Sequence, residues 1–234
     1  GTANGPMAEI TSFQKTVCEK GPTAGSAFSF PNTVYNAAGG HLSIFTKTKG
    51  YCATVANGSQ AGIQSIAYAY DVLQKGDEQV MMACGTDENS AEIDKLFRAA
   101  GAGENYVLGE GSSALVLETK SFADGRSVHK YAEVAGCALA HSAECSAEAL
   151  DRAIENALAK AGASAAEIKA VYGFANGTNL DEMQKNAVSR YFAGAAVVDV
   201  RAETGDCRAA SDNYAALMAA KAIDGGEYEN AIVL

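Results

Sequence analysis

Stretches with helical periodicity alternate with short apolar runs along most of the chain. Apolar positions recur at helical spacing from Pro6 to Gly21, and proline near the start with glycine at the end commonly bounds a helix. A second apolar stripe begins at Ser59 and stops at Gly76, which predicts an amphipathic helix packed on a sheet. Further helices are predicted over residues 147–160, 181–192 and 209–222.

Apolar runs rich in strand-forming residues lie between or beside these helices. They are YCATVA (51–56), EQVMMACG (78–85), KAVYGFA (169–175), AAVVDV (195–200) and NAIVL (230–234). A further stretch, ENYVLGEGSSALVLET (104–119), predicts a hairpin about a Gly-Glu-Gly turn. Because strands and helices alternate, the pattern predicts an α/β sandwich with largely parallel sheets. The same β/α rhythm occurs on either side of Lys130, so we expect two halves, 1–130 and 131–234.

The composition is that of a globular protein, since 48% of the 234 residues are hydrophobic and 20% are charged. The net charge of −10, with no cluster of lysine or arginine, disfavours nucleic acid and anionic membranes as partners. No apolar run approaches the length of a membrane span and no signal peptide opens the sequence, so we expect a cytoplasmic protein.

The residues usually needed for a cofactor site are not found in a suitable pattern. Six scattered cysteines without a C-x-x-C pair indicate reduced thiols rather than a metal site. The glycine-rich stretches match neither G-x-G-x-x-G nor a P-loop, so we expect no nucleotide cofactor. Both ends, GTANGPMAEI (1–10) and ENAIVL (229–234), resemble the interior of a domain, so we expect a piece of something larger.

Ser59 marks the passage from the predicted strand 51–56 to the helix that follows. The first N–H groups of a helix are unpaired and face outward, which is why many enzymes place a nucleophile there. A serine hydroxyl needs an adjacent base, and no histidine lies nearby in the sequence. Serine is also a leading helix N-cap residue, so the residues leave open a nucleophile and a cap.

Several segments resemble the β-ketoacyl-acyl-carrier-protein synthases, or ketosynthases, of the thiolase superfamily. They are FPNTVYNAAGGHLSI (30–44), GDEQVMMACGTDE (76–88) and GEGSSALVLET (109–119), in the order and spacing of that family. VYGFANGTNLDE (171–182) resembles the family's His-Gly-Thr-Gly-Thr segment, and VRAETGD (200–206) resembles its Lys-x-x-x-Gly-His segment. The resemblance implies a thiolase-like layered α/β sandwich. It is incomplete, because the family's opening strands and closing Gly-Phe-Gly-Gly strand are missing.

The resemblance also implies where the family's catalytic side chains would stand. The family uses a cysteine at a helix N-terminus, two histidines and a lysine; the matching positions here carry Ser59, Phe174, Asp206 and Arg201. A serine hydroxyl does not ionise near neutral pH as a helix-start thiol does. Phe174 handles no proton, and Asp206 brings negative charge close to where an enolate must form. Arg201 is a permanent cation. Together these replacements argue against condensation.

Two further expectations follow from the same alignment. We expect Arg201 to form an internal ion pair with Asp206 or with Glu182, which matches the family's acidic residue after Gly-Thr. Gln60 opens a Gln-Ala-Gly stretch that resembles chain length factors, which carry glutamine at the cysteine position. The match is offset by one residue, so Gln60 is either an acyl-pocket residue or an exposed residue at the helix start.

The first functional hypothesis is a non-condensing, degenerate ketosynthase-like subunit of fatty acid or polyketide biosynthesis. It would dimerise with an active ketosynthase or with itself, pair strands near 51–56 across the dimer, and shape the acyl pocket. Acyl carrier protein would be the further partner. The alternative is an active synthase or acyltransferase that uses Ser59 with a base from another chain. A third possibility is one portion of a split protein. Whether the chain is an enzyme therefore stays open.

Overall fold

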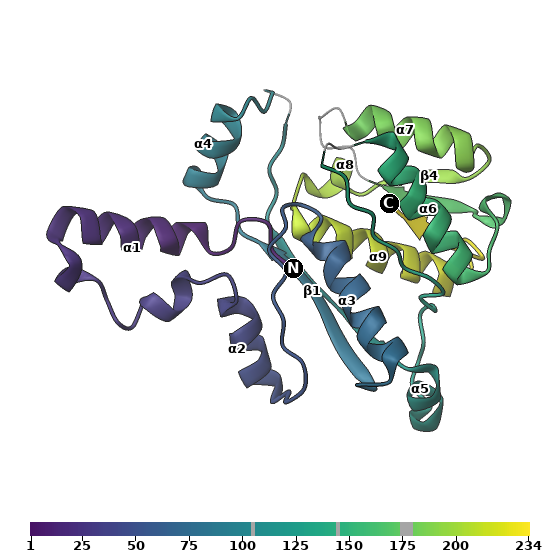
Figure 1. The fold of residues 1–234 in the computed structure, drawn as a ribbon, viewed down its shortest axis with the longest axis horizontal. Helices are drawn as coiled ribbons and strands as arrows, with labels where there is room; N and C mark the ends of the chain where they lie inside the picture. The colour runs from purple at the N-terminus through teal and green to yellow at the C-terminus, as the bar shows by residue number, and fades with distance from the viewer. Residues whose placement is uncertain (104–105, 144–145, 174–179) are drawn as a thin grey trace.

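The computed structural model describes residues 1–103, 106–143, 146–173 and 180–234. Its α-helices are α1 (Met7–Lys20), α2 (Ala37–Thr46), α3 (Ala61–Lys75), α4 (Ala91–Ala99), α5 (Lys120–Arg126), α6 (Ala147–Ala161), α7 (Leu180–Tyr191), α8 (Arg201–Thr204) and α9 (Ala209–Asp224). Its strands are β1 (Val80–Asp87), β2 (Gly111–Glu118), β3 (Ala170–Gly173), β4 (Ala196–Asp199) and β5 (Ala231–Val233). Short 3-10 turns occupy Pro22–Ala24, Phe30–Thr33 and Ala165–Glu167. Figure 1 shows the order along the chain.

Local sequence signals set the boundaries of most of these helices. The Ser146 hydroxyl accepts the amide of Ala149 and starts α6, while Gly76 ends α3 in a left-handed conformation. The stretch Ser-Ala-Ala-Glu at 164–167, which has the sequence pattern of a capping box, forms one, with the Glu167 carboxylate accepting the Ser164 amide at 2.7 Å. The helices predicted from periodicity are therefore found within one or two residues of their expected bounds.

Two small sheets organise the chain. β1 and β2 pair antiparallel in a register that runs from Val80 opposite Glu118 to Asp87 opposite Gly111. β3 lies between β4 and β5, and both pair with it in parallel. The parallel sheet agrees with the sequence pattern. The antiparallel β1–β2 pair does not agree with it. Residues 88–110 connect these two strands, and an antiparallel pair needs no crossover connection.

Helices α3 and α9 lie between the two sheets and make a layered arrangement (Figure 1). Ile66 and Ala69 of α3 pack with Ala83 of β1, and Ala216 of α9 joins the same cluster. Ala215 and Ala219 of α9 pack instead on the β3–β4–β5 sheet. A separate cluster around Val171 and Ile154 covers the other face of that sheet with α6 and α7. The α/β sandwich predicted from the sequence is confirmed.

The two central helices approach each other unusually closely at their N-terminal ends. A Cβ atom added to Gly62 of α3 would lie 2.0 Å from the carbonyl oxygen of Ala209, and one added to Gly85 would lie 2.4 Å from it. Both positions therefore require glycine for steric reasons. The glycine of the Gln-Ala-Gly stretch, Gly62, is therefore explained by the close contact between α3 and α9.

The hairpin predicted over 104–119 is wrong. Among its described residues, 106–119, only the second run forms a strand, β2, and the partner of β2 is β1. Tyr106–Leu108 lies instead against the segment before α9: Asp206 donates its amide to the Val107 carbonyl at 2.8 Å, and Gly109 donates to Asp206 at 3.0 Å. The long antiparallel pairing of β1 and β2 outweighs a local turn of the chain.

The strand predicted over 51–56 is also absent, since this segment has no regular secondary structure and is largely exposed. The segment is attached to the start of the chain by a backbone hydrogen bond, in which the Thr2 amide donates to the Val55 carbonyl at 3.0 Å. Helices α4, α5 and α8 were not predicted. Helix α4 does carry a helical signal that the sequence reasoning missed, since Ile93, Leu96 and Phe97 stand at helical spacing after the N-cap residue Ser90, whereas α5 and α8 are too short to show a period. Within the described residues, no helix is both long and apolar enough to cross a membrane.

Candidate functional site

Ser59 lies two residues before Ala61, the first residue of helix α3, and is half-buried. The N-cap position belongs to Gln60, whose side chain makes no capping hydrogen bond and is exposed. The interpretation of Ser59 as a helix N-cap is therefore wrong. The chain turns tightly there, with the amide of Ala61 donating to the Gly58 carbonyl at 3.1 Å, so the helix begins later than the apolar stripe indicates.

The start of α3 is capped by a side chain from far away in the sequence. A carboxyl oxygen of Asp212, on α9, accepts the amide of Ile63 at 3.1 Å. Ile63 is the third residue of the helix, and this is the donor that an N-cap side chain normally satisfies. Asp87 does the same for α9, since its Oδ2 accepts the amide of Ala209 at 3.0 Å. Each central helix is thus capped by a buried carboxyl group from another element.

Arg201 and Asp206 form a buried ion pair. Arg201 Nη2 lies 3.3 Å from Asp206 Oδ1, and the two side chains are 3% and 4% exposed. The internal pairing predicted from the sequence is confirmed with Asp206. The other expected partner, Glu182, lies on α7 and bonds Lys185 at 3.2 Å on the surface.

Asp206 accepts two further hydrogen bonds. The amide of Arg208 donates to its Oδ1 at 2.8 Å, and the Tyr106 hydroxyl donates to its Oδ2. A carboxylate with a guanidinium and two donors has most of its lone pairs engaged. Asp206 is therefore fixed in place, at the position where the resemblance places the second catalytic histidine.

Burial shifts the pKa values of Asp212 and Tyr106. Burial raises the pKa of Asp212 to about 7, against smaller lowering effects of the Ile63 amide and of Arg201. Burial, followed by the hydrogen bond to Asp206, raises the pKa of the Tyr106 phenol well above its ordinary value. Tyr106 therefore stays protonated and remains a donor to Asp206 at physiological pH.

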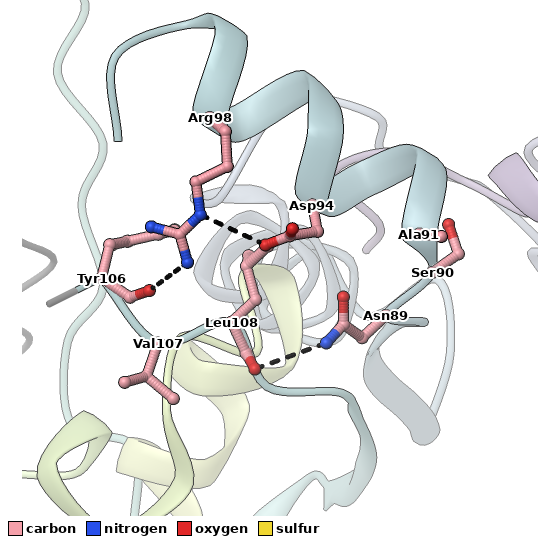
Figure 2. A pocket seen from close by; sticks show the side chains of 8 residues that line it. All are labelled: Asn89, Ser90, Ala91, Asp94, Arg98, Tyr106, Val107 and Leu108. Carbon is pink, nitrogen blue, oxygen red and sulfur yellow. Dashed lines mark hydrogen bonds and ion pairs between the residues drawn. The ribbon is translucent and has the colours of Figure 1, made fainter. Parts of the chain in front are cut away.

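Tyr106 also forms part of the wall of an open hollow of about 520 Å³ beside the start of α4 (Figure 2). Its lining consists of Asn89, Ser90, Ala91, Asp94, Arg98, Tyr106, Val107 and Leu108. Arg98 lies 3.4 Å from Asp94 and donates to the Tyr106 carbonyl at 3.1 Å, which fastens α4 to the segment that carries Tyr106. Ser59, Arg201 and Asp206 do not line this hollow.

The described thiols and imidazoles do not resemble an activated pair. Burial raises the pKa of Cys84 and of Cys207, which keeps both thiols protonated near neutral pH. His41 lies 3.0 Å from Asn32 Oδ1, and His129 lies 2.9 Å from Asp224, both at exposed sites. Phe174, the position of the first family histidine, lies outside the described residues. Among the described residues, no group of acids, cysteines and histidines has the arrangement of a metal site.

Sequence reasoning missed Asp212, Tyr106, Arg208 and Asp87, which the structure brings to this region. Arg208 and Asn213 are fully buried, and Asp212 is nearly so. A usable signal did exist in the stretch CRAASDNYAALM (207–218), where Arg, Asp and Asn interrupt an alanine-rich helix. Such residues are seldom fully buried unless they have partners, but periodicity does not say which partners they have.

Sequence comparison relates the chain to enzymes of known name. It is 29% identical to 3-oxoacyl-[acyl-carrier-protein] synthase 2 of Rhizobium meliloti (strain 1021), over 81% of this chain and 51% of that protein. It is 28% identical to the protein of the same name from Vibrio cholerae serotype O1, over 58% of this chain and 37% of that one. The matches thus span about half of the length of one relative and about a third of the other. No protein-family model matches it.

Structure comparison gives matches over nearly the whole chain. The ishigamide ketosynthase/chain length factor superposes with a TM-score of 0.88 at 23% identity, over 97% of this chain and 61% of that one. A β-ketoacyl synthase from Burkholderia phymatum STM815 gives 0.85 at 23%, over 96% and 62%. A type II polyketide synthase acyl carrier protein in complex with its ketosynthase bound to the hexaketide gives 0.86 at 19%, over 95% and 64%. At these identities the matches establish the fold, and the layered fold predicted from the sequence is confirmed.

Proposed function

Because this chain is a ketosynthase-family protein with the thiolase fold, we propose that it is a non-condensing subunit of fatty acid or polyketide biosynthesis. In this proposal it pairs with an active ketosynthase, or with a second copy, and contributes to the shape of the acyl pocket. The observation that carries the proposal is the buried Arg201–Asp206 pair, to which Tyr106 is hydrogen-bonded.

The chemistry of condensation explains why this pair matters. Loss of carbon dioxide from a malonyl thioester leaves an enolate, so the site must present hydrogen-bond donors and positive charge to the thioester oxygen. Here the corresponding position carries an acceptor-only carboxylate, and the adjacent cation is engaged by it. Ser59 adds a hydroxyl that does not ionise without a base. In the proposal, Phe174 replaces the first histidine of the family and handles no proton, and Gln60 lines the acyl pocket.

The exposed apolar residues support pairing with another chain. Residues 7–46, which include α1 and α2, contain no fully buried residue. Phe28 and Phe45 are 90% and 86% exposed, and Ile44 and Tyr51 are also exposed. Clusters of this kind mark interaction surfaces. The extended segment 51–54 next to them offers backbone groups for the cross-dimer pairing we propose.

Acyl carrier protein is the second proposed partner, by analogy with the complex found among the structural matches. The division into halves 1–130 and 131–234 belongs to the same proposal. It is supported by the separate β1–β2 and β4–β3–β5 sheets, one in each half. Helix α9 of the second half packs on β1 of the first, so the halves would fold together.

The test is incubation of the chain with an acyl-acyl-carrier-protein thioester, followed by intact mass spectrometry. We expect an unmodified mass, while an active ketosynthase treated in parallel gains the acyl group on its cysteine. Addition of malonyl-acyl carrier protein should yield no β-ketoacyl product from this chain alone. An acyl adduct that disappears in Ser59→Ala would contradict the proposal and establish the alternative, an acyltransferase that uses Ser59.

A further inference from the structure

The N-terminus of α3 is the part of the site where an anion would gain most from the helix. Unpaired amides and the helix dipole favour negative charge there, and the same effect lowers the pKa of thiols placed at a helix start. Helix α3 has no acidic residue in its own first turn, and its N-cap residue Gln60 makes no side-chain hydrogen bond. Nothing in the local sequence therefore neutralises this end of the helix.

Asp212 supplies the missing group from α9. Its Oδ2 accepts the amide of Ile63 at 3.1 Å, so the carboxyl group occupies the place of an N-cap side chain. The Asp212 side chain is buried, and it is brought there by the close contact of α3 and α9 at Gly62. Ser59 directly precedes this capped end. A nucleophile or oxyanion at position 59 would thus share the helix terminus with a carboxyl group.

We propose that the Asp212 carboxyl group occupies the N-terminal end of α3, so that the amides and dipole of the helix cannot stabilise the negative charge of a nucleophile or acyl oxyanion at position 59. The inference rests on the proposed non-condensing function and gives it a specific physical cause. Asp212 is a positioning residue in this account, because it acts through the helix end and not on a substrate.

The charges around Asp212 favour this role. The positive charge of Arg201, on α8, lowers the pKa of Asp212, and the negative charge of Asp206, in the following loop, raises it. Arg201 is at the same time the ion-pair partner of Asp206. From α3 it meets the backbone amide of Ile63. Because burial raises the pKa of Asp212 to about 7, its negative charge develops around neutral pH. The opposition to an anion at position 59 should therefore grow between pH 6 and pH 8.

A thiol placed at position 59 reports on this effect directly. The full chain carrying Ser59→Cys is compared with Ser59→Cys/Asp212→Asn by timed alkylation with isotope-labelled iodoacetamide from pH 6 to 9, followed by peptide mass mapping at residue 59. Asparagine keeps an oxygen for the Ile63 amide but carries no charge. We expect the double variant to react about threefold to tenfold faster at pH 8. At pH 6 we expect similar rates.

Asp71→Asn in the Ser59→Cys background is the matched control. Asp71 is exposed in the C-terminal half of α3, far from the helix start, so the same change of charge should leave the alkylation rate unchanged. If Asp212→Asn does not fold, Asp212→Ser, which is also neutral, replaces it. Equal rates in the Ser59→Cys variants with and without Asp212, or an equal gain from Asp71→Asn, would overturn the inference. The readout is independent of the acylation test, which uses Ser59 itself.

Discussion

Asp206 and Asp212 are both buried carboxyl groups, but their surroundings give them different properties. Asp206 has a guanidinium, a phenol and a backbone amide as partners. Asp212 has one backbone amide, and burial raises its pKa to about 7. At the scale of single residues, burial with a single hydrogen-bond donor favours the protonated form of Asp212.

The pH dependence of stability follows from Asp212. Its pKa rises from about 4 in the unfolded chain to about 7 in the folded one, so the folded chain binds the additional proton between these values. The free energy of unfolding should therefore fall as the pH rises through this window, by at most about 1.4 kcal/mol per pH unit. Urea unfolding at pH 5, 6, 7 and 8 measures the slope.

Asp212→Asn provides the comparison for that slope. The variant cannot titrate at this position, so its free energy of unfolding should decrease less between pH 5 and pH 7 than that of the parent chain. Other titrating groups are common to both proteins and cancel in the difference. Identical slopes would show that Asp212 has the same proton affinity in the folded and unfolded chains.

At the scale of elements, the contact between α3 and α9 determines the geometry of the site. It places Asp212 at the start of one helix, and Asp87 of β1 at the start of the other. The contact depends on Gly62, which faces the carbonyl oxygen of Ala209 and the side chain of Asn213. Two helices that approach this closely leave no space for a methyl group between them.

Gly62→Ala is predicted to destabilise the chain. The added Cβ would lie 2.0 Å from the Ala209 carbonyl oxygen, so the helices must separate, at a cost of about 1–3 kcal/mol in the free energy of unfolding. Gly40→Ala in α2 is the matched control: nothing lies within 4 Å of its added Cβ, and alanine should stabilise that helix by about 0.5–1 kcal/mol. Chemical denaturation of both variants tests the prediction, and similar effects would contradict it.

At the scale of the whole molecule, apolar surface is distributed unevenly. The sheets and the central helices share the buried clusters, whereas α1 and α2 extend away from them (Figure 1). Large apolar side chains are exposed on α2 and on the segment between the two helices, among them Phe28 and Phe45. The backbone of 51–54 is likewise exposed. A chain with this distribution is expected to bury its N-terminal surface against another polypeptide.

Ala53→Pro is predicted to weaken that association without unfolding the chain. Ala53 is exposed, and proline removes its backbone donor from any pairing between strands. We expect an unchanged thermal unfolding temperature for the isolated chain, and loss of co-purification with a ketosynthase co-expressed from its genomic neighbourhood. Ala132→Pro, in another exposed segment without regular structure, should leave co-purification intact. Equal association of both variants with the ketosynthase would exclude pairing through 51–54.

Much of the secondary structure was predictable because its signals are local. The periodicity of α3, the capping box at Ser164 and Glu167, and the apolar runs of β1 and β3 depend on neighbouring residues only. The pairing of β2 with β1 was not predictable, because a turn motif at 109–111 favours a nearby partner. The Arg201–Asp206 pair was one of two pairings expected from the family alignment, and the structure shows Asp206, not Glu182, as the partner.

The sequence by itself determined most of the longer helices, the α/β class, the family resemblance and the identity of Ser59, Arg201 and Asp206 at the positions that the resemblance aligns with catalytic side chains, because each is written in the identity and local spacing of residues. Only the tertiary structure decided what now surrounds those positions. Asp212 lies 149 residues from Ile63, and Tyr106 lies 100 residues from Asp206. Contacts of that range depend on how the two central helices pack between the sheets, and such packing is not encoded in any short stretch of the chain.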